Sequence, residues 1–134
     1  MTKPLLVDTS AWIEFLRATG SPVHLEVRRL IQEDARLATT DVVIMELLAG
    51  GLASGDRSRL WALMNRCVML PTTPLFDYER AARLYVLCRA GGFTPSNSND
   101  LLVAAVAIGR NSLLLAADQD FEQIAAVSSL RLVA

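Results

Sequence analysis

The sequence predicts an α/β fold with a mainly parallel central sheet and helices on both faces, as a single domain over residues 1–134. Short apolar runs of strand length alternate with longer segments whose apolar residues recur at helical spacing. The short runs are apolar on both faces, which is typical of parallel strands covered by helices on each side. With 134 residues, 52% hydrophobic and 20% charged, the chain can bury one core and is small for two domains.

The first third of the chain predicts a strand, two helices and a second strand. Residues 4–8 are a short apolar run that ends in an aspartate, and they form the first strand. Helices over residues 10–17 and 23–33 follow, because each segment gathers apolar side chains on one side. A Gly-Ser-Pro sequence separates these two helices. Residues 36–40 form the second strand.

The middle third predicts two more helices, a strand and a long helix. Residues 41–49 are helical up to a pair of glycines, which is a common stop signal, and a further helix covers residues 54–66. Residues 67–70 form a strand closed by a proline. Residues 75–90 form a long helix with one apolar stripe, again ended by two glycines.

The last third begins with a polar loop over residues 94–99. The next segment, residues 100–110, is apolar on nearly every face, and we expect a buried helix. A strand over residues 113–117, a short helix over 119–126 and a last strand over 130–133 complete the prediction.

The composition excludes several classes of protein. Thirteen basic and 14 acidic residues give a net charge of −1, which excludes a strongly basic nucleic-acid coat protein and leaves room for a local basic patch. His24 is the only histidine and Lys3 the only lysine, so a ribonuclease with a histidine acid–base pair is excluded, and a phospho-receiver, which needs a well-placed lysine, does not fit. No P-loop sequence is present. Cys67 and Cys88 form no metal-binding pattern, and we expect two free, buried thiols.

The sequence carries no pattern of export or membrane insertion. The first residues do not read as a signal peptide. The longest apolar stretch, residues 101–108, is far shorter than a membrane span. We therefore expect a soluble, cytoplasmic protein.

Three aspartates fall where parallel α/β proteins bind ligands, at the carboxyl ends of strands and the starts of helices. Asp8 closes the first strand, Asp118 closes a later strand, and Asp100 opens the most apolar helix. Each has a structural alternative, because an aspartate at a helix start caps backbone N–H groups. Asp41 and Asp77 fit only that alternative.

Glu46 is a carboxylate in an otherwise apolar helix, Val42-Val-Ile-Met-Glu46-Leu-Leu-Ala49. Burying a bare carboxylate is very costly. The side chain of Glu46 therefore either points to water as a surface glutamate or faces a polar cavity inside the fold.

Four carboxylates could converge at one end of the sheet: Asp8, Glu46, Asp100 and Asp118. Such a group repels itself strongly unless protons or cations offset the charge. Oxygen ligands suit hard ions such as Mg²⁺ or Mn²⁺. Carboxylate-held ions of this kind are a common device for hydrolysing phosphodiester bonds.

These residues resemble the PIN-domain proteins, and more narrowly the VapC-type toxins of bacterial and archaeal toxin–antitoxin pairs. The resemblance extends from Leu5 to Phe121. It rests on an ordered set of motifs: Leu5-Leu-Val-Asp8-Thr-Ser10-Ala-Trp12-Ile13, Glu46 in its apolar helix, Asn99-Asp100-Leu-Leu-Val-Ala-Ala105, and Leu114-Leu-Ala-Ala-Asp118-Gln-Asp120-Phe121. It implies a Mg²⁺- or Mn²⁺-dependent endoribonuclease that leaves a 5′-phosphate and a 3′-hydroxyl. It also implies a homodimer held inactive by a VapB-type antitoxin.

The resemblance assigns roles by position. The metal ligands would be Asp8, Glu46, Asp100 and Asp118. Ser10 matches the hydroxyl residue that follows the first aspartate, where it bonds to Asp8 or to a phosphate, or simply caps the helix. Asp120 would be an outer or water-mediated ligand, or a first-turn helix acid. Ala116 departs from the family, whose members often carry Thr or Ser there, and this puts the geometry near Asp118 in doubt.

The resemblance implies an RNA substrate such as tRNA or ribosomal RNA, which would need basic side chains around these acids. The candidates are Arg17, Arg28, Arg29, Arg57, Arg59 and Arg110, and the sequence does not rank them.

An antitoxin helix would need an apolar groove. The first half of the chain supplies candidate side chains for it: Trp12, Phe15, Leu47, Leu48, Leu52, Trp61 and Leu63. Two alternatives stay open, a non-catalytic PIN-like module that binds RNA or protein, and a DNA nuclease with similar chemistry.

Overall fold

The computed structural model describes residues 3–50 and 54–133. Over these residues it has a sheet of parallel strands in the order β3-β2-β1-β4. The strands are β1 (Leu5–Val7), β2 (Leu37–Thr39), β3 (Val68–Met69) and β4 (Leu114–Leu115). The central strand β1 aligns Leu6 with Ala38 on one side and with Leu114 on the other. The predicted parallel α/β class is confirmed.

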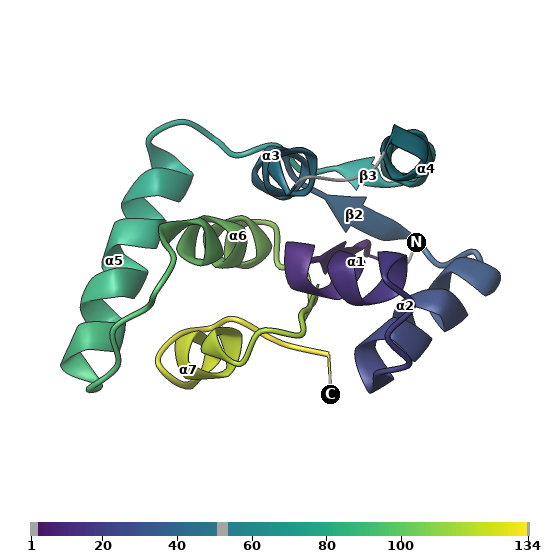
Figure 1. Cartoon of the computed structure of the whole chain (residues 1–134). Helices are drawn as coiled ribbons and strands as arrows, with labels where there is room; N and C mark the ends of the chain where they lie inside the picture. The colour runs from purple at the N-terminus through teal and green to yellow at the C-terminus, as the bar shows by residue number, and fades with distance from the viewer. Residues whose placement is uncertain (1–2, 51–53, 134) are drawn as a thin grey trace.

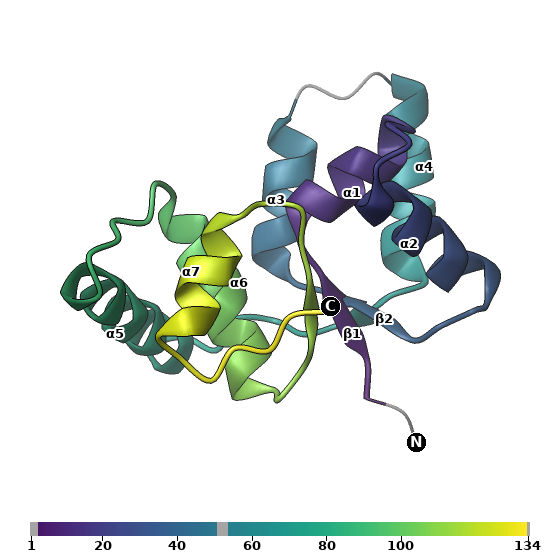
Figure 2. The same ribbon diagram turned by 90° about the horizontal axis from the view of Figure 1, so that it is seen from below.

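Seven helices surround this sheet in the described part of the chain. They are α1 (Thr9–Leu16), α2 (Pro22–Gln32), α3 (Asp41–Ala49), α4 (Ser54–Asn65), α5 (Phe76–Ala90), α6 (Ser98–Gly109) and α7 (Asp120–Ala126). Figures 1 and 2 show α1 to α4 gathered on one side and α5 to α7 on the other. Among these helices, none is long and apolar enough to cross a membrane.

The core lies between the sheet and the helices, with α6 at its centre. Six residues of α6 from Leu101 to Ala107 are buried, as the all-round apolar sequence predicts. Trp12 of α1 and Phe121 of α7 are the largest fully buried side chains. Both cysteines are free, as expected, although only Cys88 is buried and Cys67 is half-buried.

Two predicted strands on the β4 side of the sheet differ from the structure. The strand over residues 113–117 is reduced to Leu114–Leu115, because the N–H groups of Ala117 and Asp118 donate to Ser10 Oγ and not to a neighbouring strand. The predicted last strand over residues 130–133 is wrong. Only Leu132 forms a bridge there, to Leu114, since β4 offers so short a partner.

Candidate active site

The carboxyl ends of the strands carry the acidic residues that the sequence singles out. Asp8 directly follows β1, and Asp118 follows β4 in the loop before α7. Asp100 lies in the first turn of α6, and Asp120 is the first residue of α7. Glu46 comes from α3, which packs against both α1 and α6. Five elements therefore supply the candidate site.

Asp8 combines a structural role with a free oxygen atom. Its Oδ2 caps α1 by accepting from Ser10 N at 3.0 Å and Ser10 Oγ at 2.6 Å. Its Oδ1 is buried and has no hydrogen-bond partner among the described residues. Burial raises the pKa of the Asp8 carboxyl, the hydrogen bonds from Ser10 oppose this, and the charge of Glu46 raises it further.

Ser10 joins two parts of the site. Besides donating to Asp8, its Oγ accepts from Ala117 N at 2.9 Å and Asp118 N at 3.3 Å. Of the readings left open by the sequence, the bond to Asp8 is confirmed and the helix cap is wrong, because Asp8 itself is the N-cap. The loop before Asp118 is thus held by a hydroxyl from α1, although Ala116 lacks one.

Asp100 is a buried carboxyl at the start of α6. It does not cap α6, as one alternative held, because Asn97 accepts from Asn99 N at 2.9 Å and takes that role. The side chain of Asp100 is only 5% exposed, and its Oδ2 finds no hydrogen-bond partner within the described residues. Burial, with the charges of four other carboxylates, raises the pKa of Asp100 to about 8.

The four carboxylates that act on Asp100 are the other predicted acids: Asp8, Asp118, Glu46 and Asp120. Asp100, Asp118 and Asp120 lie closest, with one carboxylate oxygen of each within 4.8 Å of the others. The structure therefore brings together all five acids that the sequence selects. It leaves Asp41 and Asp77 elsewhere, where both accept hydrogen bonds in the Thr72–Thr73 region.

Glu46 faces inward on the side of α3 nearest α1. It is half-buried, and its Oε1 accepts from Thr9 Oγ1 at 2.8 Å. It also lines a small hollow with Ile13, Arg17 and neighbouring residues. The inward reading of Glu46 thus agrees with the structure, and the simple surface reading does not.

The chemistry of this donor set fits a divalent cation. Two buried carboxylate oxygens, Asp8 Oδ1 and Asp100 Oδ2, lack hydrogen-bond donors in the described chain. Unpaired buried charge of this kind is costly, and a hard cation with oxygen ligands would offset it. Beside the acids lies an open hollow of about 360 Å³, lined by Ser10, Ile13, Glu14, Ala117 and Asp118. A substrate group could enter there.

A family model described as "PIN domain" matches residues 5–127. The chain belongs to the PIN-domain family. It is also 39% identical over 128 residues to "VapC ribonuclease Mb1587" of Mycobacterium bovis and to "Ribonuclease VapC11" of Mycobacterium tuberculosis, which places it among the VapC proteins. These alignments cover 95% of this chain and 96% of each relative.

Solved structures of VapBC complexes share this PIN fold. VapBC2 from Rickettsia felis, bound to a DNA fragment from its promoter, superposes with a TM-score of 0.77 at 18% identity, over 98% of both chains. VapBC-5 from Mycobacterium tuberculosis superposes with a TM-score of 0.67 at 26% identity, also over 98% of both chains.

Sequence reasoning missed three polar residues that support the site of this VapC-family chain. Thr9 holds Glu46, and Ser96 Oγ donates to Asp120 Oδ2 at 2.9 Å. Asn97 caps α6 and so sets the position of Asp100. The Thr-Ser pair after Asp8 was visible in the sequence, but nothing there indicates that Thr9 contacts a residue of another helix.

The structure separates the candidate arginines. Arg29 forms ion pairs with Glu26 and Glu33, Arg110 donates to Pro71 O, and Arg59 stacks over the Phe15 ring. Among the described residues, Arg17, Arg28 and Arg57 form no ion pair. Of these three, Arg17 lines the hollow that contains Glu46.

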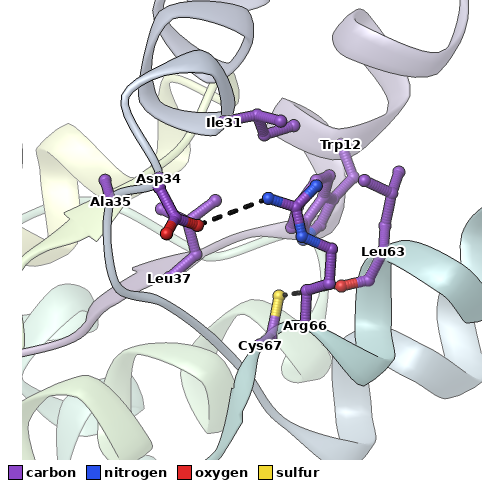
Figure 3. Close-up of a pocket in the computed structure, with 8 residues that line it drawn as sticks. All are labelled: Trp12, Ile31, Asp34, Ala35, Leu37, Leu63, Arg66 and Cys67. Carbon is purple, nitrogen blue, oxygen red and sulfur yellow. Dashed lines mark hydrogen bonds and ion pairs between the residues drawn. The ribbon is translucent and has the colours of Figure 1, made fainter.

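The apolar side chains considered for an antitoxin groove are mostly core. Trp12, Phe15 and Leu47 are buried, and Trp61 is exposed. Leu52 lies outside the described residues. Figure 3 shows the residues that line a cavity beside Trp12, among them the ion-paired Arg66 and Asp34. The cavity has a volume of about 30 Å³, and the ion pair has an N···O distance of 3.5 Å. The cavity has room for about one water molecule and contains none of the clustered acids.

Proposed function

We propose that this chain is a Mg²⁺- or Mn²⁺-dependent endoribonuclease toxin of a toxin–antitoxin pair. The proposed metal ligands are Asp8, Glu46, Asp100 and Asp118, with Asp120 as an outer or water-mediated ligand. The observation that carries the proposal is the pair of buried, unpartnered oxygens, Asp8 Oδ1 and Asp100 Oδ2, inside a cluster of five carboxylates. The identity to proteins named VapC ribonucleases supports an RNA substrate.

The chain's own residues hold the site in a fixed geometry. Asp8 is oriented by its cap on α1, and Thr9 orients Glu46 from the next position. Ser10 ties the Asp118 loop to Asp8. When bound, Mg²⁺ or Mn²⁺ supplies the positive charge that activates water and stabilises the leaving oxygen of a phosphodiester. We expect products with a 5′-phosphate and a 3′-hydroxyl.

The hollow beside Asp118 gives the substrate phosphate access to the clustered carboxylates. It is open and shallow, so a polynucleotide chain can lie across it without threading. Backbone N–H groups at the start of α1 and α6 favour a phosphate nearby. This arrangement suits cleavage within a strand.

The experiment that tests the proposal is cleavage of total cellular RNA by the purified chain, freed of any bound antitoxin. It is run with Mn²⁺ or Mg²⁺, with EDTA, and with Asp100→Asn beside the wild type. We expect discrete products that vanish with EDTA and fall at least a hundred-fold in the variant, because the replaced oxygen is proposed to hold the ion. Full activity of Asp100→Asn would refute the site.

The same assay separates the alternatives. RNA binding without metal-dependent cleavage would favour a non-catalytic module. Faster cleavage of DNA than of RNA with the same sequence would favour a DNA nuclease, since metal ions act on the phosphate and not on the 2′-hydroxyl.

We also propose two protein partners. One is a VapB-type antitoxin, in line with the VapBC complexes that share the fold. The other is a second copy of the chain. Its support is the set of exposed apolar side chains along α5, namely Phe76 near its start and Val86 and Leu87 near its end. We propose that the protein acts in the cytoplasm, together with its proposed RNA substrate and partners.

A further inference from the structure

We propose that Glu14 is a specificity residue that binds the Watson–Crick edge of an unpaired guanine beside the scissile phosphate, with Arg17 contacting the adjacent phosphate. This inference rests on the proposed ribonuclease function and adds a base preference to it. It begins with Glu14 of α1 and Arg17, the residue that follows α1 as its C-cap. Neither side chain has an ionic partner within the described chain.

Glu14 lies on the same face of α1 as Ser10, one turn further from the carboxylate cluster. Ser10 and Glu14 are four residues apart and therefore lie about one helical turn from each other on the same face. Ser10 contacts Asp8 and the Asp118 loop, so Glu14 is the next position outward. Ser10 and Glu14 line the open hollow of about 360 Å³, together with Asp118.

Arg17 lies one turn beyond Ile13. It lines a separate small hollow, of about 40 Å³, with Glu46 and Leu47. Ile13 lines both hollows, so they adjoin along α1. Although Glu14 and Arg17 are spaced i, i+3, they do not pair with each other. Each faces its own hollow, and each remains available to a ligand.

A carboxylate in a cleft that binds RNA does not bind the phosphates, because the two negative charges repel each other. It accepts hydrogen bonds only, through two oxygens side by side. Guanine offers two adjacent donors on its Watson–Crick edge, N1–H and the N2 amino group. Adenine and cytosine place an acceptor nitrogen beside their single amino group, and uracil flanks its N3–H with two carbonyls. Glu14 therefore matches guanine, and only where the base is unpaired and its edge is free.

Arg17 has the complementary role. Its guanidinium forms no ion pair among the described residues and matches the geometry of a phosphate. A phosphate contact fixes the register of a strand without reading its sequence. Arg17 thus holds the strand, and Glu14 reads one of its bases.

The test measures binding apart from cleavage. Asp100→Asn protein is titrated with labelled single-stranded oligonucleotides that differ only in guanine, inosine or adenine at one position. If the wild type cleaves RNA, the varied position is the one beside the cut at which its cleavage products show a base preference. If the wild type does not cleave, each position of the oligonucleotide is varied in turn. Inosine lacks the N2 amino group, so guanine should bind roughly tenfold more tightly, as expected for a good two-bond contact. In Asp100→Asn with Glu14→Ala, guanine and inosine should bind equally.

Matched variants separate recognition from charge. Glu33→Ala removes a glutamate that pairs with Arg29 on α2, and the guanine preference should persist. Arg17→Ala should weaken binding of all oligonucleotides alike and lower the salt dependence by about one phosphate contact. Arg29→Ala should do neither.

A guanine preference that survives Glu14→Ala would overturn the proposal, as would equal binding of the three bases while Glu14 is present. The outcome is independent of catalysis. If the wild type cleaves no RNA but guanine binding still depends on Glu14, the nuclease proposal fails, and what remains is a guanine-binding site without a scissile phosphate beside it. If cleavage occurs with no base preference, the nuclease proposal stands and this one fails.

Discussion

Ionising the Asp100 carboxyl is unfavourable when the site holds no cation. The pKa of its carboxyl is raised from 3.8 to about 8 by burial and by the neighbouring carboxylates. Between these two pH values the folded chain binds more protons than the unfolded chain. Its free energy of unfolding in EDTA should therefore fall as the pH rises from about 4 to about 8.

Asp100→Asn should remove most of this pH dependence and make the metal-free protein more stable at pH 8. Thermal unfolding across this pH range measures both effects, with Asp34→Asn, an exposed change in a surface ion pair, as the control. Mg²⁺ or Mn²⁺ should raise the melting temperature of the wild type more than that of Asp100→Asn. Equal pH profiles for the wild type and Asp100→Asn would contradict this account.

The identity of the site residues was largely predictable from the sequence. A carboxylate that follows an apolar strand, or interrupts an apolar helix, is conspicuous because burial penalises charge. Asp8, Glu46 and Asp100 stand out for that reason. Thr9 and Glu14 do not, since a threonine or glutamate near a helix start has many ordinary explanations. Their contacts depend on packing between helices far apart in the sequence.

At the scale of elements, Ser10 links α1 to the loop between β4 and α7. Its Oγ donates to Asp8 Oδ2 and accepts from the backbone N–H groups of Ala117 and Asp118. Ser10→Ala should lower the free energy of unfolding by about 1–3 kcal/mol, because two backbone N–H groups and Asp8 lose a partner. Metal affinity, measured by calorimetric titration, should fall about tenfold as Asp118 loses its fixed position.

Ser58→Ala provides the control for Ser10→Ala. Ser58 is an exposed serine of α4, so its loss should change stability by less than about 0.5 kcal/mol and leave metal binding intact. Metal affinity unchanged in Ser10→Ala would contradict the linking role.

Element boundaries followed the sequence where local signals are strong. The helices over residues 41–49 and 75–90 were placed within a residue of α3 and α5, since glycines end them. The start of α6 was missed by two residues, because the cap is Asn97 and not Asp100. The last strand failed because a strand depends on its partner: β4 is two residues long, and only Leu132 bridges to it.

At the scale of the whole molecule, α5 lies on the outside, away from α1 and most of the site (Figures 1 and 2). Phe76 is 71% exposed and Val86 is 64% exposed. Exposed apolar side chains near both ends of α5 favour contact with another chain, and in a two-fold dimer each subunit would bury the same surface. The homodimer proposal therefore predicts that α5 forms the interface.

Val86→Arg should dissociate that dimer. Burying one such side chain contributes about 1.5–3 kcal/mol, and a two-fold interface carries the change in both subunits. The dissociation constant should rise by roughly a hundred-fold or more, which light scattering with gel filtration would detect as a shift to monomer. Leu25→Arg, the same kind of change at an exposed position of α2, should leave the mass unchanged. Because α5 supplies none of the clustered carboxylates, the Val86→Arg monomer should still bind Mn²⁺. A Val86→Arg protein that remains dimeric would move the interface to another face of the molecule.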